Sequence, residues 1–287
     1  MVPDLDVYLF DLRGYIHLRG ALSPEEVAAC NDCLDAIPRL EPGQWYGHVQ
    51  GHTYGTLDGL NYQQIYEAGE PFERLIDHPS WIEHVKLFVG GEGTFDYHHG
   101  PLFIDECFAG FRGPGEAIGL HSGGHPPIHR NQFRYHGGRF MCGQVNVLVA
   151  LTDIGSGDGC TMVIPGSHKS NFQHPDYHRQ HMRPGGATVE GTEGAVEVHI
   201  AAGDALVFVD GISHGSARRT RPGERRVCVY RYGPSWGNFR LGYAPSPELL
   251  ARLTPERRRI VQPLELLPRE PQVKAPAAGV PGPGGAP

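Results

Sequence analysis

The sequence lacks any long run of apolar residues. A membrane-spanning helix needs ~20 of them in succession, and no segment approaches that, so we expect no contact with a membrane. Basic residues are also in short supply, with 25 Lys and Arg against 32 Asp and Glu and a formal net charge of −7. This balance argues against a binder of polymeric nucleic acid, although a local basic patch can still hold a phosphate. We therefore expect a small-molecule partner, and the sequence leaves the oligomeric state open.

Cysteine is scarce, with six residues scattered over 287. They are Cys30, Cys33, Cys107, Cys142, Cys160 and Cys228. No cleavable apolar segment follows the N-terminal methionine, so we expect a cytoplasmic protein whose thiols stay reduced. Cys30 and Cys33 form a CxxC pair within a helical pattern, without a second pair. We interpret them as buried thiols rather than as a zinc or redox site.

Glycine and proline, in contrast, are abundant, with 40 and 25 residues. They indicate many turns and favour a β architecture over a helical bundle. Four β-rich runs support this, each broken by Gly, Pro or Asp: "GPLFIDECFAGF" (100–111), "RFMCGQVNVLVALTD" (139–153), "AVEVHIAAGDALVFVDG" (195–211) and "RRVCVYRYGPSW" (225–236). The sequence predicts a mainly β, antiparallel fold.

Helical patterns lie before these runs. A strand is predicted at 15–18, followed by a helix for which Ser23 is the N-cap, Pro24 the first helical position and Glu26 the partner in a capping box. A second helix is predicted over 79–89 from apolar residues at helical spacing. These helices would flank the β-fold on its N-terminal side.

The remaining segments define the domain organisation. Residues 41–70 show little periodicity and predict a long loop region that could fold over a site. Residues 1–265 are predicted to form a single domain. Residues 266–287 are mostly Pro, Gly and Ala with almost nothing to bury, so we expect a disordered tail.

Three residues suggest chemistry. His121 ends a β-run, His214 follows 93 residues later and Arg225 follows after 11 more. This spacing is compatible with a jelly roll that brings facing strands to one open end. Two imidazoles suit a mononuclear metal, and a guanidinium can grip the carboxylate of an organic acid that also chelates the metal.

The chain resembles the phytanoyl-CoA dioxygenase family of iron(II)- and 2-oxoglutarate-dependent oxygenases from about residue 5 to 240. The motifs are "DLRGYIHLRGALSPEE" (11–26), "VALTDIGSGDGCTMVIPGSHKSN" (149–171) and "SHGSARRTRPGERRV" (213–227), with His121 between the first two. The resemblance implies a double-stranded β-helix (jelly roll, cupin-like), with iron(II), 2-oxoglutarate and O2 as cofactors. It also implies that His121 and His214 bind the iron and that Arg225 binds the C5 carboxylate of 2-oxoglutarate.

One position departs from the family pattern. The family has a carboxylate two residues after its first ligand histidine, and here that residue is Gly123. Because glycine offers no donor and no bulk, a chloride ion could take the open coordination position and replace the lost negative charge. The pattern His-x-Gly resembles iron- and 2-oxoglutarate-dependent halogenases, including those acting on nucleotides in chlorinated nucleoside antibiotic pathways. The sequence therefore predicts a halogenase in natural-product biosynthesis that chlorinates an unactivated C–H bond.

Alternatives to chlorination stay open. The glycines at 123 and 124 could form a simple turn while a third ligand comes from elsewhere, although they disfavour a helix that would aim His125 at the same metal. The chain could then be a hydroxylase or another oxygenase, or a degenerate binding protein without catalysis.

Four polar residues are candidates near the co-substrate. The resemblance places the hydroxyls of Thr161 and Ser216 close to 2-oxoglutarate. Gln144 and Asn146 alternate with apolar residues, so both should point to the same face of a strand. Buried amides need partners, and either a bound co-substrate or an internal hydrogen-bond network could supply them.

The substrate prediction rests on Arg, His and aromatic residues in 129–139 and 174–183. Arg130 and Arg134 are candidates for gripping phosphate, with aromatic rings stacking on a base, so an anionic nucleotide is the expected substrate. The alternative is two solvated loops. His168 and Lys169, after Pro165 and Gly166, are either substrate contacts or parts of a structural turn.

Overall fold

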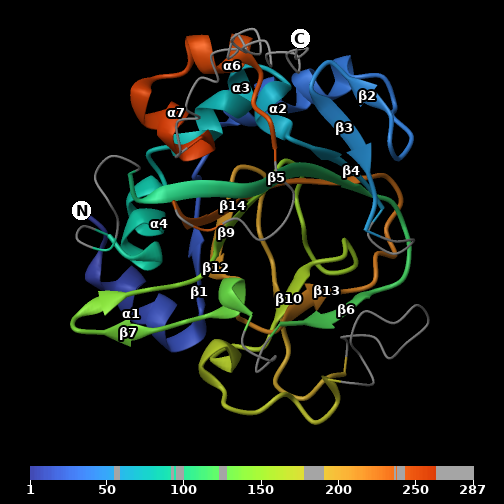
Figure 1. Cartoon of the computed structure of the whole chain (residues 1–287). Coiled ribbons are helices and arrows are strands. Elements are labelled where there is room, and N and C mark those ends of the chain that lie inside the picture. The colour runs from blue at the N-terminus through green and yellow to red at the C-terminus, as the bar shows by residue number, and fades with distance from the viewer. Residues whose placement is uncertain are drawn as a thin grey trace, which may run out of the picture.

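Two antiparallel sheets make up the body of the molecule, as the computed structural model shows (Figure 1). The structure describes residues 1–54, 59–91, 94, 100–122, 128–177, 191–235, 237 and 243–262. The large sheet has the strand order β1-β12-β9-β14-β5-β4-β3-β2, the small sheet has the order β11-β10-β13-β6, and β7 pairs with β8. The predicted mainly β, antiparallel architecture is confirmed.

The strands are β1 (Tyr15–Leu18), β2 (Trp45–Tyr46), β3 (Val49–His52), β4 (Leu60–Gln63), β5 (Leu102–Arg112), β6 (Ile118–His121), β7 (Tyr135–His136), β8 (Arg139–Phe140), β9 (Val145–Ala150), β10 (Thr161–Val163), β11 (Val196–Val198), β12 (Ala205–Val209), β13 (His214–Ser216) and β14 (Arg225–Pro234). The α-helices are α1 (Asp4–Arg13), α2 (Pro24–Ala36), α3 (Glu70–Glu73), α4 (Ile82–Val89), α6 (Pro247–Arg252) and α7 (Pro255–Val261). Short 3-10 turns are η1 (Ile65–Glu67), η2 (Arg74–Asp77), η3 (His129–Asn131) and η4 (Ser167–Lys169).

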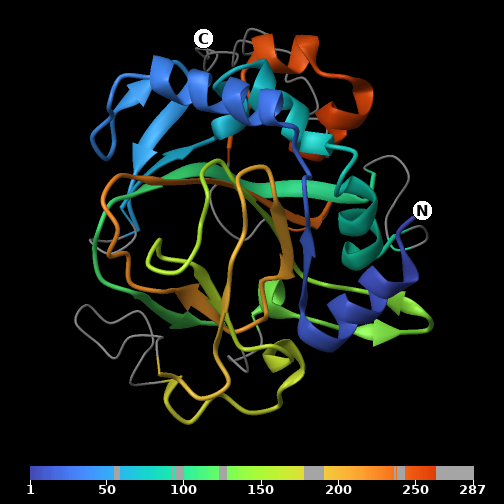
Figure 2. The same cartoon turned by 180° about the vertical axis from the view of Figure 1, so that it is seen from behind.

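The predicted start of α2 is confirmed. Ser23 caps the helix by accepting from the backbone N–H of Glu26, and the Glu26 carboxylate accepts in return from the N–H of Ser23. Cys30 is buried in α2 and Cys33 is half-buried. Figure 2 shows α2 lying across the outer face of the large sheet.

The predicted helix over 79–89 is shorter than expected. It begins at Ile82, after Trp81 as N-cap, because the backbone first turns at His78, whose carbonyl accepts from the N–H of Trp81. The predicted inward residues Trp81, Val85 and Phe88 are fully buried. The periodicity thus gave the buried face but not the boundary.

Helix α1 was not predicted. Its Phe10 is fully buried and stacks on Phe88, with ring centroids 3.6 Å apart. Gly14 ends the helix at φ 84°, a conformation that favours glycine, and a Cβ there would lie 2.5 Å from the His168 ring. An aromatic anchor, a tight turn and an ion pair between Asp6 and His84 at 2.8 Å thus help to hold a helix that lacks a long apolar stripe.

The expectation of a long loop over 41–70 is wrong for much of that segment. Strands β2, β3 and β4 extend the large sheet beyond β5, and η1 follows. Polar residues such as Asn61 and Gln63 occupy sheet positions here and are buried. The apolar alternation on which strand prediction depends is therefore missing.

The two faces of the large sheet have different roles. Along β14, Arg225, Val227, Val229 and Arg231 alternate on one face and line a pocket between the sheets. Tyr230, between Val229 and Arg231, points the other way, as does Tyr232 beyond a register shift, and both donate hydrogen bonds to backbone carbonyls of α3 and η2. The core thus lies between the large sheet and its helices, while the opposite face is left for a site.

None of the helices in the described part of the chain has the length and hydropathy to cross a membrane.

Candidate metal and co-substrate site

Two histidines meet on neighbouring strands of the small sheet. His121 ends β6 and His214 begins β13, and the two residues are directly paired in the antiparallel register. Their ring centroids lie 4.0 Å apart. The sequence prediction that these residues come together is thus met by the backbone pairing of two short strands.

Backbone carbonyls orient both rings. Nδ1 of His214 lies 2.8 Å from the carbonyl oxygen of Ile212, and Nδ1 of His121 lies 3.3 Å from that of Gly119. Because a carbonyl only accepts, each Nδ1 must carry the proton, and each Nε2 keeps a lone pair. This is the tautomer that metal-binding histidines commonly use.

The surroundings of His121 favour the neutral form of its ring. Burial is the largest cause that holds the pKa of His121 well below its usual value, and the neighbouring His214 lowers it further. The carboxylate of Asp210 acts in the opposite direction. A neutral imidazole is the form that binds a metal ion, so the pair fits a divalent transition metal.

A guanidinium lies in the same pocket. Arg225 is buried, and its Nη2 donates to the Thr161 hydroxyl at 3.4 Å. Its Nε has no hydrogen-bond partner among the described residues. Burial, followed by the charge of Arg112, lowers the pKa of Arg225 to about 9, so the group stays charged at neutral pH. A buried charged donor without a partner fits an anionic ligand.

The pocket has a volume of about 400 Å³ and joins these groups. Its lining includes His121 and His214 together with three of the predicted co-substrate residues, Thr161, Ser216 and Arg225. Thr161 and Ser216 are directly paired across β10 and β13. The donor set of two imidazoles, two hydroxyls and a guanidinium fits a metal chelated by a carboxylic acid.

Polar groups also gather where Asp210 follows β12. Asp210 is almost fully buried, accepts from the Asn146 amide at 3.0 Å and lies 3.7 Å from Nε of Arg130. Arg130 is the predicted substrate residue that the structure places in the pocket lining. A second ion pair joins Arg231 to buried Glu106 at 3.2 Å.

Other predicted site residues lie elsewhere. Gln144 donates to the buried Asp105 carboxylate at 2.8 Å, so Gln144 and Asn146 belong to an internal hydrogen-bond network, and neither lines the pocket. Arg134 is exposed on the loop before β7 and donates to Gln132.

His168 and Lys169 face α1 instead of the pocket. The His168 ring contacts Phe133 edge-on at 4.5 Å, and its Nε2 donates to the carbonyl oxygen of Asp11. Lys169 forms an ion pair with the Asp11 carboxylate at 2.9 Å. The structural-turn alternative describes their contacts.

Gly123 and His125 fall outside the described residues, as does the predicted tail 266–287. In the described part of the chain, no carboxylate forms a three-residue cluster with His121 and His214 within 4.8 Å.

Three charged residues at the pocket were missed by the sequence reasoning. Arg112 and Arg231 line the pocket, and Asp210 pairs with the lining residue Arg130. Arg231 and Asp210 were read only as members of β-rich runs, and Arg112 lies just after one such run. The signal was the charge itself, because a charged residue within a β-run is seldom buried without a partner. Arg112 stands opposite Arg225, and Arg231 opposite Glu106, in the register of β5 and β14.

The jelly-roll fold and the donor set of this pocket are those expected of an iron- and 2-oxoglutarate-dependent dioxygenase. A comparison with protein families gives the same class. Residues 10–227 match the phytanoyl-CoA dioxygenase (PhyH) family. The chain belongs to that family.

Among relatives, dioxygenase cdmD of Talaromyces verruculosus is 35% identical over 89 residues, which cover 31% of this chain and 24% of cdmD. HygX of Streptomyces hygroscopicus, solved with nickel and 2-oxoglutarate, has a TM-score of 0.68 at 23% identity and covers 87% of this chain and 94% of its own. SnoK, a non-heme alpha-ketoglutarate-dependent carbocyclase from nogalamycin biosynthesis, has a TM-score of 0.53 at 20% identity, covering 81% and 84%. These structural likenesses confirm the jelly-roll fold.

Proposed function

We propose that this chain is an iron(II)- and 2-oxoglutarate-dependent enzyme that oxidises a C–H bond of a small polar molecule. One observation carries the proposal: two adjacent imidazoles and a buried arginine with an unpartnered Nε line the same pocket. Membership of the phytanoyl-CoA dioxygenase family supports it. The solved HygX structures, one with iron and one with nickel and 2-oxoglutarate, support the same cofactors here.

The groups divide by chemistry. His121 and His214 would hold iron(II) through Nε2, and Arg225 would bind the distal carboxylate of 2-oxoglutarate with help from the hydroxyls of Thr161 and Ser216. When bound, iron and 2-oxoglutarate together reduce O2 and supply the oxidising equivalents, as 2-oxoglutarate becomes succinate and CO2.

The chain's own residues prepare the pocket. Arg225 and Arg112 give positive charge where the carboxylate binds. Side chains of Leu148, Val227 and Val229 line the same pocket and exclude water from it. A drier wall strengthens the ion pair between guanidinium and carboxylate. An ion pair between Arg225 and the distal carboxylate would therefore orient the other end of 2-oxoglutarate toward the metal.

The substrate is proposed to be a small polar molecule, with an anionic nucleotide as the specific candidate. Arg130 supports this because it lines the pocket and a guanidinium pairs with phosphate. The rings of Tyr54 and Phe108 also line the pocket, where they could stack on a base. HygX has been solved with hygromycin B, so that compound belongs in the same substrate screen.

Chlorination is a second candidate, favoured by the identity of residue 123. Glycine at this position supplies no carboxylate to the metal, and chloride could supply the negative charge instead. Hydroxylation turns R–H, O2 and 2-oxoglutarate into R–OH, succinate and CO2. Chlorination also consumes chloride and one proton, and it gives R–Cl, succinate, CO2 and water.

The test incubates the iron-loaded protein with 2-oxoglutarate, O2 and a panel of nucleotides and hygromycin B, and measures succinate and product mass. Parallel reactions contain no halide, chloride or bromide. A product gaining oxygen in all three supports hydroxylation, and a mass shift that follows the halide supports chlorination. Absence of succinate release across the panel, in protein that has bound iron, would overturn the enzymatic proposal and leave a binding protein.

A further inference from the structure

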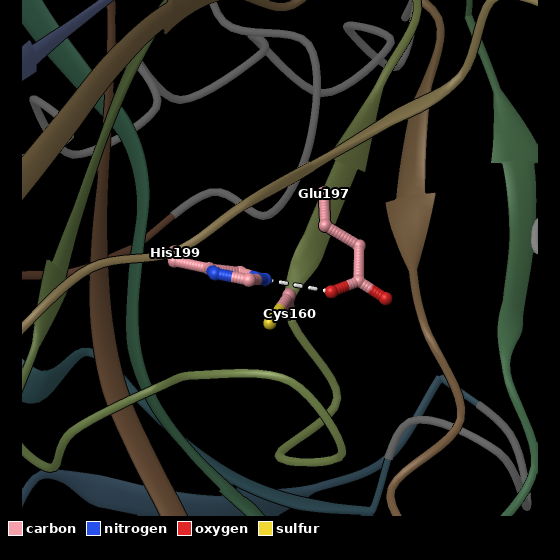
Figure 3. A group of neighbouring side chains, drawn as sticks. All are labelled: Cys160, Glu197 and His199. Atoms are coloured by element: carbon pink, nitrogen blue, oxygen red, sulfur yellow. Dashed lines mark hydrogen bonds and ion pairs between the residues drawn. The ribbon is translucent and has the colours of Figure 1, made fainter.

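A second group of ligand side chains lies at the edge of the small sheet, apart from the histidine pair (Figure 3). It consists of Cys160, Glu197 and His199. One donor atom from each lies within 4.8 Å of the others. The Nε2 of His199 and a carboxylate oxygen of Glu197 are 2.7 Å apart.

The sheet register explains this convergence. Thr161 pairs with Val198, and Met162 with Glu197. Carried one residue further, the antiparallel register sets Cys160 opposite His199. Because side chains alternate along a strand, the cluster lies on the face opposite to Thr161. Thr161 lines the co-substrate pocket, so the cluster is on the far side of β10 from it.

The donors differ in chemistry, and this selects the metal. Sulfur, imidazole nitrogen and one carboxylate oxygen suit Zn²⁺, which accepts all three in tetrahedral sites. Mg²⁺ and Ca²⁺ prefer oxygen ligands throughout. Three protein ligands leave the fourth position of a tetrahedral site to water.

We propose that Cys160, Glu197 and His199 form a zinc site that is separate from the iron site. The path to it is open, because the His199 side chain is 54% exposed and that of Glu197 is 32% exposed. Cys160 lies behind them, fully buried. Zinc reaches the sulfur by way of the two exposed ligands.

Binding requires a proton to leave. The Cys160 thiol donates to the carbonyl oxygen of Gly155 at 2.9 Å. Burial, and next the Glu197 carboxylate, raise the pKa of this thiol to about 11. Zinc replaces the thiol proton, and its positive charge reverses the effect of the carboxylate. Zinc affinity should therefore rise with pH.

The alternative is an ordinary surface ion pair between His199 and Glu197 beside a buried thiol. In that case the Cys160 sulfur would not bind an added metal ion. Spectroscopy of the sulfur therefore distinguishes the two, and activity is a poor readout because excess zinc can displace iron from the histidine pair.

The experiment titrates Co²⁺ into the His121→Ala variant, in which the iron site is disabled, and records the near-ultraviolet thiolate-to-cobalt charge-transfer band. We expect a band that saturates at one equivalent and disappears when Zn²⁺ is added. X-ray absorption of the zinc form should show one sulfur at about 2.3 Å. The His121 and His214 site has no sulfur, so it cannot produce either signal.

Variants assign the ligands. Cys160→Ser should abolish the band, and His199→Ala and Glu197→Gln should each weaken Co²⁺ binding at least tenfold. Cys33→Ser, which removes a half-buried thiol elsewhere, should bind as the parent does. Because residues 197 and 199 are exposed, their variants remain informative if Cys160→Ser is poorly folded. Absence of a thiolate band, or unchanged Co²⁺ binding in both exposed-ligand variants, would overturn the zinc site.

Discussion

Arg112 and Arg225 stand directly opposite each other in the antiparallel pair of β5 and β14, and both side chains are buried. Like charges facing each other across a sheet are destabilising. A further cation, Arg219, also lowers the pKa of Arg225, although Arg219 has its own ion pair with Asp158 at 3.1 Å. A carboxylate bound at this end of the pocket, such as the distal carboxylate of 2-oxoglutarate, would offset the repulsion between these cations.

Replacing Arg225 tests this directly. Arg225→Gln should raise the Kd for 2-oxoglutarate about 10- to 100-fold, since a charge-assisted hydrogen bond contributes about 1.5–3 kcal/mol. Without 2-oxoglutarate, its stability should be unchanged or higher, because the repulsion is relieved. Calorimetric titration with Mn²⁺ as the metal, and thermal melts, measure both effects.

Arg226→Gln is the matched control. Arg226 lies next in sequence on the other face of β14, paired with Asp35 at 2.7 Å. Its variant should bind 2-oxoglutarate normally. Equal losses in both variants would show that the effect on Arg225 is structural rather than specific to the co-substrate.

The histidine pair gives a second prediction. His121→Ala and His214→Ala should each lose stoichiometric iron and all succinate release, because a single imidazole is left to hold the metal. Metal analysis after anaerobic loading and desalting measures this. His136→Ala, at an exposed position on β7, should retain both iron and activity. An active variant at either 121 or 214 would contradict the metal assignment.

Gly123→Asp separates the two candidate reactions. A carboxylate at this position would compete with chloride for the metal, so any chlorinated product should disappear and hydroxylated product could take its place. If the parent is a hydroxylase, halide has no effect on its product. Product mass in chloride and in bromide measures the outcome, and normal chlorination by the variant would show that residue 123 does not provide the halide site.

Sequence reasoning located the metal and co-substrate candidates because each stands in a motif at a strand end. His121, His214, Arg225, Thr161 and Ser216 all reach one pocket. Their positions depend on local register, which the family motifs carry. The roles of Arg112 and Asp210 could not be predicted in the same way, because their neighbours in the structure lie on segments far away in the chain.

The positions of the loop residues could not be predicted, for a related reason. Arg130 and Arg134 are four residues apart and looked equivalent, yet only Arg130 reaches the pocket. Its ion pair with Asp210 joins two elements 80 residues apart. Likewise, His168 and Lys169 found partners on α1, a helix without a strong sequence pattern. Tertiary contacts of this kind leave no local periodicity.

That difference makes Arg130 and Arg134 a matched pair. Arg130→Gln should raise the KM for an anionic substrate about tenfold, since it removes one charged contact, and should leave the Kd for 2-oxoglutarate unchanged. Arg134→Gln should alter neither value. Steady-state kinetics with the substrate found in the nucleotide screen provides the measurement. If Arg134→Gln has the larger effect, the exposed loop rather than the pocket wall recognises the substrate.

His168 supplies a pH-dependent test of stability. Burial lowers the pKa of His168 to about 4, from an ordinary value of 6.5. Between these values the unfolded chain takes up a proton that the folded protein does not, so the contribution of this group to stability is lost as pH falls from 6.5 toward 4. The parent should lose roughly 2 kcal/mol from this group between pH 7 and pH 5. His168→Gln lacks this loss, so its destabilisation relative to the parent should shrink by that amount in urea unfolding.

Thr254→Ala is the control. It removes the N-cap of α7 and should cost about 1 kcal/mol at both pH values. A constant difference for His168→Gln would mean that the folded protein also protonates this histidine.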